Sequence, residues 1–226
     1  LRPGAHAADV APMALPDAML VSGAICERTL TRQGYPASCA FVCGPLRHRE
    51  ALALVRQQPD RGTLRAAHGL PHDATVLFVA ASVVSADAQA MLWSLAAAVR
   101  AVGRCVVIVK MHPAAIRLSS DLQALTLAVG ATAVRECTSH DAMYELMAAS
   151  DAVITGGSTL AFEAIALGVV PILFETPSSF SASSFVPFEH ACFVTRNAAQ
   201  LTAAIHSVIG QDAAVTEKRR NWPALV

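Results

Sequence analysis

The clearest fold signal in the chain lies in residues 151–174, which read DAVITGGSTLAFEAIALGVVPILF. A short apolar run, 152–154, leads into a polar turn with two glycines, an alanine-rich stretch that closes at Gly168, and a second apolar run, 170–174. Apolar runs of this length, bounded by glycine, are typical of strands buried on both faces, and the stretch between them has the length of a helix. The segment therefore predicts two parallel strands joined by a helix.

The same alternation continues on both sides of this unit. We expect strands at Val76–Ala80, Cys105–Val109, Thr132–Val134, Ala152–Ile154 and Val170–Phe174. We expect helices from Ser85 onward and at Ser120–Val129, Asp141–Ala149, Ser158–Leu167 and Asn197–Ile209. About five strands alternating with helices predict an α/β fold, a doubly wound, Rossmann-like parallel sheet with right-handed crossovers.

The N-terminal part has its own organisation. Residues 1–16 are rich in Ala and Pro and predict a tail or linker. Residues 17–73 begin with a strand–helix–strand unit and end in a segment, Asp60–Asp73, whose glycines and proline are typical of a linker. We therefore expect a partial unit of one domain in 17–73, a complete Rossmann-like domain in 74–210, and a C-terminal tail in 211–226. The strands of the first unit are expected at Ala18–Val21 and Cys39–Val42.

Composition excludes several classes of protein. The 226 residues carry 17 basic and 17 acidic side chains and are 54% hydrophobic, which excludes a disordered chain. Zero net charge and two lysines, Lys110 and Lys218, argue against a nucleic-acid-binding surface. The apolar runs fall short of the about 20 residues that cross a bilayer, and the N-terminal residues resemble no secretory signal.

The cysteines and histidines indicate neither disulfides nor a metal site. Six cysteines are scattered without a C-x-x-C pair, and no histidine lies at metal-ligand spacing. Reduced thiols in apolar runs behave as small hydrophobic residues. We therefore expect a cytoplasmic protein that binds no metal.

The turn after 152–154 is the strongest candidate for a binding site, because ligands of doubly wound sheets bind beyond the carboxyl ends of the strands. Gly156 and Gly157 allow close approach of a ligand, and the following helix start favours an anion such as phosphate. Ser158 and Thr159 add hydroxyl donors. Glu163 lies one turn further on the same helical face, where it can accept hydrogen bonds from ribose hydroxyls. In the alternative interpretation, Ser158 only caps the helix and Glu163 points to solvent.

Two further strand exits carry polar groups. Lys110 and His112 follow the strand 105–109, where an ammonium and an imidazole can meet a phosphate oxygen. A protonated His112 would also stabilise the charge that develops on a leaving phosphate, although strand-end histidines often have only structural roles. Ser139 and His140 precede the helix 141–149 and are candidates for contacts with a base or ribose.

The usual nucleotide motifs are missing. The chain has neither the G-x-x-x-x-G-K-[ST] motif of P-loop NTPases nor the G-x-G-x-x-G motif of ordinary dinucleotide enzymes. The main sequence evidence for either class is therefore missing. The run 156–160 superficially resembles the nucleophile elbow of serine hydrolases. Leu160 stands where that turn needs a second glycine, which leaves a hydrolase as a weak third option.

Taken together, Lys-x-His-Pro at 110–113 and the hydroxyl pair at 158–159 resemble the donor-binding half of GT-B glycosyltransferases. More narrowly, they resemble the bacterial sialyltransferase and Kdo-transferase group, which uses CMP-sugars. Residues 153–172 are similar to glycosyltransferases of surface-carbohydrate biosynthesis. The resemblance covers about residues 74–210, and residues 16–45 resemble the last unit of the neighbouring acceptor-side domain.

The resemblance implies functional roles and partners. By position, Lys110 and His112 contact the donor phosphate, Ser158 and Thr159 bind it from the helix end, and Glu163 or the 139–141 loop holds ribose. The implied substrates are a nucleotide-sugar, CMP-linked in that group, and a glycan acceptor, with no cofactor and no metal. The resemblance also allows peripheral association of the complete protein with a membrane. The acceptor-side domain, which usually supplies the catalytic base, is present at most in part, so we assign no general base.

Two other functions stay open. A sugar-nucleotide epimerase of the same fold would place the same groups around a diphosphate. A non-catalytic nucleotide-binding or interaction domain is the alternative from another class.

Overall fold

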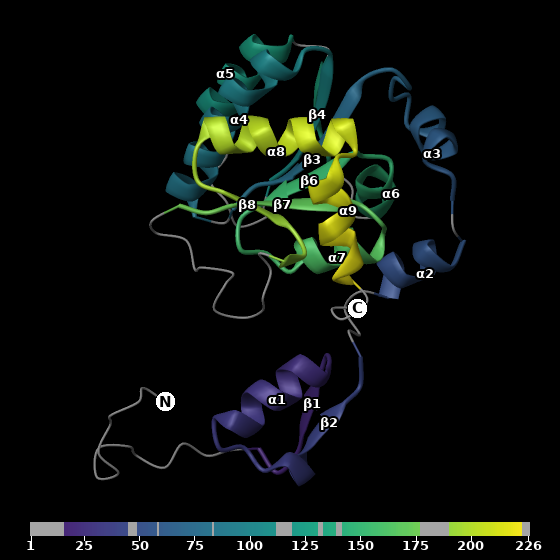
Figure 1. The fold of residues 1–226 in the computed structure, drawn as a ribbon, viewed down its shortest axis with the longest axis vertical. Coiled ribbons are helices and arrows are strands. Elements are labelled where there is room, and N and C mark those ends of the chain that lie inside the picture. Colours follow the sequence, from purple (N-terminus) through teal and green to yellow (C-terminus); the bar gives the residue numbers. More distant parts are fainter. Residues whose placement is uncertain are drawn as a thin grey trace. The chain divides into compact units, whose positions relative to one another are not determined.

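The computed structural model describes residues 16–44, 49–57, 59–82, 84–111, 119–130, 133–138, 142–176 and 190–222. By its internal contacts the chain divides into two compact units, residues 1–49 and 50–226. Figure 1 shows both units.

The first unit is a two-stranded parallel sheet with one helix. Strands β1 (Met19–Val21) and β2 (Ala40–Val42) are joined through α1 (Ala24–Arg32) and a short 3₁₀ helix, η1 (Ala37–Cys39). Tyr35 is buried, and its hydroxyl donates a hydrogen bond of 2.9 Å to the carbonyl of Pro16. The expected strand–helix–strand unit is confirmed.

The second unit is built on a six-stranded sheet in which every described pairing is parallel, in the order β5-β4-β3-β6-β7-β8. The strands are β3 (Thr75–Ala80), β4 (Cys105–Lys110), β5 (Val134–Glu136), β6 (Ala152–Thr155), β7 (Val170–Phe174) and β8 (Phe193–Thr195). The helices are α2 (Arg49–Gln57), α3 (Arg61–Ala67), α4 (Ser85–Val102), α5 (Ser119–Val129), α6 (Met143–Ala148), α7 (Leu160–Ala166), α8 (Ala198–Gly210) and α9 (Ala213–Arg220).

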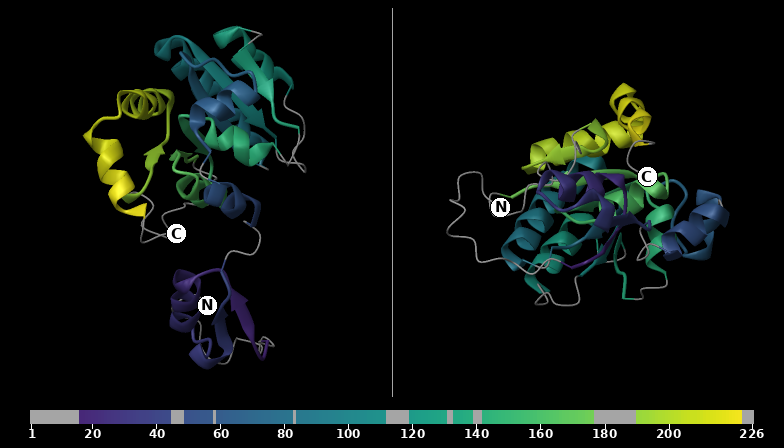
Figure 2. Two further views of the ribbon diagram at one scale, coloured as in Figure 1. Left: turned by 90° about the vertical axis from the view of Figure 1, so that its right-hand side faces the viewer. Right: turned by 90° about the horizontal axis from the view of Figure 1, so that it is seen from below.

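Apolar side chains fill both faces of this sheet. On one face, Leu77 and Val79 of β3 belong to a core shared with α4, α5 and α8. On the other face, Phe78 and Ala80 belong to a core shared with α2, α3, α6 and α7. Figure 2 shows these helices around the sheet in two further views. The predicted doubly wound α/β fold is therefore confirmed, since helices cover both faces of a parallel sheet.

Three elements, β8, α3 and α9, were missed in the sequence. The structure has a sixth strand, β8, after the strand that was expected to be the last. The sequence did not indicate it, because three residues are too few to produce a periodic pattern. The expected linker Asp60–Asp73 contains α3 instead. The Asp60 carboxylate accepts a 2.9 Å hydrogen bond from the Thr63 N–H and caps this helix, while Leu64 is buried against the sheet.

The expected tail 211–226 also contains a helix, α9. Its sequence is mostly polar and gives no apolar periodicity, but Val215 is fully buried. The Trp222 indole N–H donates to the carbonyl of Ala191 at 2.9 Å, which anchors the residues after the helix. By their contacts α2 and α3 belong to the second unit. The functional division of the chain at residue 73 stays a prediction.

Within the described residues, no helix combines the length and the apolar character that a membrane-spanning segment requires. The six cysteines form no disulfide. The same part of the chain contains no cluster of three or more His, Cys, Asp or Glu side chains that could hold a metal ion.

Candidate functional site

Three residues form one row across the carboxyl edge of the sheet. Ala80, at the end of β3, pairs with Lys110 of β4 on one side and with Thr155 of β6 on the other. Neighbouring strands lie about 4.8 Å apart, so the backbones of Lys110 and Thr155 are separated by roughly 10 Å. The ends of these strands meet at the same edge because the strands are parallel.

Side chains of this row point to the same face. Ile108 and Val153 lie two residues before Lys110 and Thr155, and both belong to the core under α6 and α7. Since successive residues of a strand alternate between faces, Lys110 and Thr155 project to that face as well. Ala80 contributes only a methyl group between them. The strand order therefore brings the half-buried Lys110 side chain and the β6 exit together.

Lys110 also acts on a neighbouring thiol. Cys137 follows β5, and its N–H donates to the carbonyl of Val109 at 2.8 Å. Burial raises the pKa of the Cys137 thiol, and the positive charge of Lys110 acts in the opposite direction. The ammonium of Lys110 therefore contributes positive charge to this edge.

The loop after β6 turns tightly into α7. The Ser158 N–H donates to the carbonyl of Gly156 at 2.6 Å, and the Ser158 hydroxyl accepts a 3.3 Å hydrogen bond from the Leu160 N–H. Ser158 thus caps the start of α7, as the alternative interpretation expected. Gly157 and Thr159 are exposed. A Cβ atom added to Gly156 would lie 4.0 Å from the carbonyl oxygen of Phe174, an ordinary contact, so the fold does not demand glycine there.

Glu163 is buried in the protein, with an exposed fraction of 4%. It lies on α7 between the buried Ala161 and Ala164. The alternative interpretation, in which Glu163 points to solvent, is therefore wrong on this point. The predicted ribose contact of Glu163 stays a prediction.

Three predicted site residues, His112, Ser139 and His140, lie outside the described residues. The other six, Lys110, Gly156, Gly157, Ser158, Thr159 and Glu163, are described. The structure brings Lys110 and the 156–159 loop to one edge of the sheet.

The structure also reveals polar groups at this edge that no motif indicated. The Thr176 hydroxyl, just after β7, donates a hydrogen bond to the carboxylate of Asp87 in the first turn of α4. Thr155 is 1% exposed, and in the described part of the chain its hydroxyl has no hydrogen-bond partner. A threonine at the end of an apolar strand carries no signal in the sequence that separates a binding role from strand propensity.

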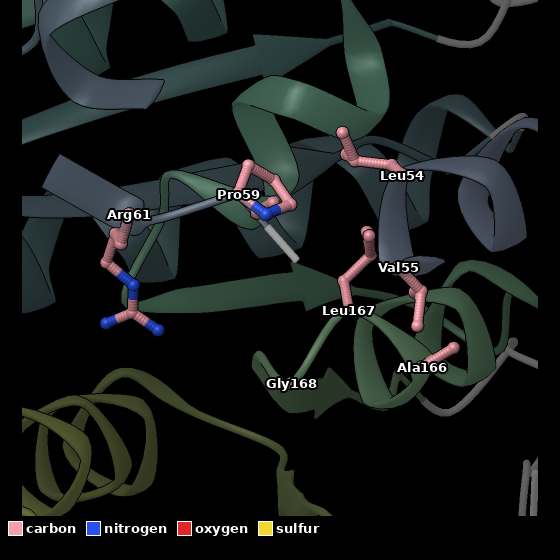
Figure 3. Close-up of a pocket in the computed structure, with 8 residues that line it drawn as sticks. Leu54, Val55, Pro59, Arg61, Ala166, Leu167 and Gly168 are labelled. Carbon is pink, nitrogen blue, oxygen red and sulfur yellow. The ribbon is translucent and has the colours of Figure 1, made fainter. Parts of the chain in front are cut away.

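A cavity of about 340 Å³ lies at the other edge of the sheet (Figure 3). Because α7 starts at the carboxyl end of β6 and runs back to the amino end of β7, its last residues mark this opposite edge. Arg61 lies at the cavity and donates a 3.2 Å hydrogen bond to Asp151, which precedes β6. The cavity is therefore separate from the candidate site. Its lining residues are Leu54, Val55, Pro59, Arg61, Ala148, Ala166, Leu167 and Gly168.

Comparison of sequences yields no relatives. A scan against models of protein families gives no match, and a search of curated proteins also gives none.

Comparison of structures yields many similar folds, of which three are informative. The wall teichoic acid polymerase TagF is 14% identical, with a TM-score of 0.62 over 92% of this chain and 53% of TagF. A Listeria monocytogenes protein described as a UDP-N-acetylglucosamine 2-epimerase is 13% identical, with a TM-score of 0.61 over 90% of this chain and 54% of the Listeria protein. HepE from Anabaena, solved with UDP-glucose, is 15% identical, with a TM-score of 0.59 over 92% of this chain and 58% of HepE.

The chain thus spans a little over half the length of each of these three proteins. At such low identity the likeness concerns the fold. The six-stranded parallel sheet with helices on both faces is the feature that the comparison supports. The chain therefore has the α/β, Rossmann-like domain fold of GT-B glycosyltransferases and of related sugar-nucleotide enzymes.

Proposed function

We propose that this chain is the donor-binding portion of a glycosyltransferase and that it binds a nucleotide-sugar at the carboxyl edge of its sheet. The observation that carries this proposal is the register of β3, which has Lys110 on one side and Thr155 on the other. A cation and a glycine-containing loop at one sheet edge, separated by one strand, match the size and charge of a phosphate or diphosphate.

Lys110 provides most of the attraction for the phosphate in this proposal. Helix α7 has seven residues, so its dipole is weaker than that of a long helix, whereas Lys110 carries a full charge. The exposed Thr159 hydroxyl and the exposed backbone at Gly157 add neutral contacts. Ser158 holds the loop in shape through its bond to the Leu160 N–H.

The proposed reaction is a displacement at the anomeric carbon of the donor sugar. An acceptor hydroxyl attacks this carbon, the bond to the nucleotide phosphate breaks, and the negative charge that develops on the phosphate is neutralised by Lys110. His112, which follows Lys110 closely in the sequence, is proposed to protonate or hydrogen-bond the same leaving group. Glu163, Ser139 and His140 are the candidates for ribose and base contacts. The acceptor is proposed to be a glycan of a surface polysaccharide.

The nucleotide of the donor has two candidates. The Lys-x-His-Pro run favours a CMP-sugar through its resemblance to sialyltransferases and Kdo-transferases. HepE was solved with UDP-glucose, which supports a uridine donor. Because both nucleotides place a phosphate beside the sugar, the role of Lys110 is the same in either case.

A sugar-nucleotide epimerase is the second candidate, and the likeness to the Listeria protein supports it. The two functions differ in their need for an acceptor. Incubation of the chain with UDP-N-acetylglucosamine, without any acceptor, would produce an epimerised sugar only in the second case.

Calorimetric titration with CMP, CDP and UDP tests the proposed function. We expect one of these nucleotides to bind to the wild type and Lys110→Ala to weaken binding by about 10- to 100-fold, because a charge-assisted contact to phosphate is lost. Lys218→Ala is the matched control. Lys218 lies on α9 over the ring of Phe193, at the start of β8 and so at the opposite edge of the sheet.

Two results would contradict the proposal. If no nucleotide binds to the wild type, the chain is better explained as an interaction domain. If Lys110→Ala and Lys218→Ala weaken binding equally, the site does not lie at the carboxyl edge.

A further inference from the structure

Two threonines at the carboxyl edge of the sheet differ in one respect. Thr155 ends β6 and Thr195 ends β8, and their exposed fractions are 1% and 2%. The Thr195 hydroxyl donates a 2.9 Å hydrogen bond to the carbonyl of Leu173. The Thr155 hydroxyl is buried and has no hydrogen-bond partner in the described part of the chain.

A buried hydroxyl without a partner is unfavourable for folding, because it loses its bonds to water and gains none. Valine has the same shape as threonine and would fill the position beside the apolar core without this loss. The packing of the described residues therefore does not explain the hydroxyl of Thr155.

The position of Thr155 points to a ligand instead. Its side chain projects to the same face as that of Lys110, and only the methyl group of Ala80 lies between them in the row. The two residues after Thr155 are glycines, the first partly exposed and the second exposed. The Thr155 hydroxyl therefore lies where β6 leads into this glycine pair, at the edge where Lys110 attracts an anion.

We propose that Thr155 is a donor-binding residue whose hydroxyl donates a hydrogen bond to an oxygen of the phosphate that Lys110 neutralises. This inference rests on the proposed function. Because the hydroxyl oxygen is buried in the structure, binding requires a local rearrangement of the 156–159 loop that uncovers it. The hydroxyl gains its partner only in the complex, so the contact favours the bound conformation of the loop.

Three variants test this role through binding and stability together. Thr155→Val removes the hydroxyl and keeps the shape, and we expect it to weaken nucleotide binding by about 10-fold while the Tm stays the same or rises. Thr155→Ser keeps a hydroxyl and should bind more tightly than Thr155→Val. Thr195→Val is the matched control, which should lower the Tm by about 2–4 °C and leave binding unchanged.

The outcomes separate this inference from the proposed function. If the wild type binds a nucleotide and Thr155→Val binds it equally well, the inference is wrong and the proposed function stands. If Thr155→Val lowers the Tm as much as Thr195→Val does, the hydroxyl has a structural partner and the inference is also wrong. If the wild type binds none of the nucleotides, both fail.

Discussion

Arg65 donates a hydrogen bond of 2.8 Å from its guanidinium to the carboxylate of Asp151, across 86 residues of sequence. The same carboxylate accepts a 2.8 Å bond from the Val76 N–H at the amino end of β3. Arg65 also donates to the carbonyls of Ala149, His72 and Ala74. The Arg65–Asp151 ion pair therefore connects α3 to the starts of β3 and β6. These two neighbouring strands end at Ala80 and Thr155.

Replacement of this buried arginine should be costly. We expect Arg65→Met to lower the free energy of unfolding by about 3 kcal/mol, because the carbonyls and the mostly buried Asp151 carboxylate lose their donor. Arg61→Met is the control. Arg61 bonds to the other oxygen of Asp151 but is 37% exposed, so its loss should cost at most about 1 kcal/mol. Urea denaturation of both variants checks the difference, and equal losses would contradict the anchoring role of Arg65.

Cys105 should make the protein less stable in alkali. Burial, with a smaller contribution from the charge of Asp151, raises the pKa of this thiol to about 12. In the unfolded chain the thiol ionises near pH 9, so its contribution to stability is complete below that pH and decreases by roughly 1.4 kcal/mol per pH unit up to the folded pKa. The urea midpoint should therefore decrease more between pH 8 and pH 10 for the wild type than for Cys105→Ala. If the urea midpoints of the two proteins decrease equally with pH, the Cys105 thiol has the same pKa in the folded and the unfolded protein.

The cap of α3 should fail in acid. The Thr63 N–H lowers the pKa of Asp60 more strongly than burial raises it. Since the folded pKa is depressed, the stabilisation is present above the ordinary range of an aspartate and is lost as the pH falls through the folded value. Asp60→Asn keeps an acceptor for the Thr63 N–H but cannot titrate. Its thermal stability should therefore depend less on pH than that of the wild type between about pH 5 and pH 2, and an unchanged dependence would be evidence against the cap.

Ser158 and Thr159 should separate structural and binding roles. Ser158→Ala removes the acceptor of the Leu160 N–H, and we expect a loss of about 1 kcal/mol in the free energy of unfolding. Thr159 makes no side-chain cap bond and is exposed, so Thr159→Val should leave the Tm unchanged and weaken nucleotide binding several-fold, about 1 kcal/mol. Thermal melts and titrations of both variants test this. Unchanged nucleotide affinity in Thr159→Val would remove that residue from the site.

The sequence predicted much of the second unit because the signals are local. The run 151–174 contains a buried strand, a glycine turn, a helix and a second buried strand, and the structure has β6, α7 and β7 there. The elements missed, α3, β8 and α9, are short or polar. They are held by contacts with segments distant in sequence, such as the bonds of Arg65 to Asp151 and of Trp222 to Ala191, and such contacts leave no periodic pattern in the sequence.

The sequence alone determined the order of most strands and helices and the polar residues that follow the strands, because buried strands appear as continuous apolar runs and helices repeat about every 3.6 residues. It could not determine that β3 lies between β4 and β6, that Glu163 is buried, or that Arg65 pairs with Asp151. These features arise when segments distant in sequence pack against one another. The tertiary structure decided that Lys110 and Thr155 project to one face of the sheet with a single methyl group between them.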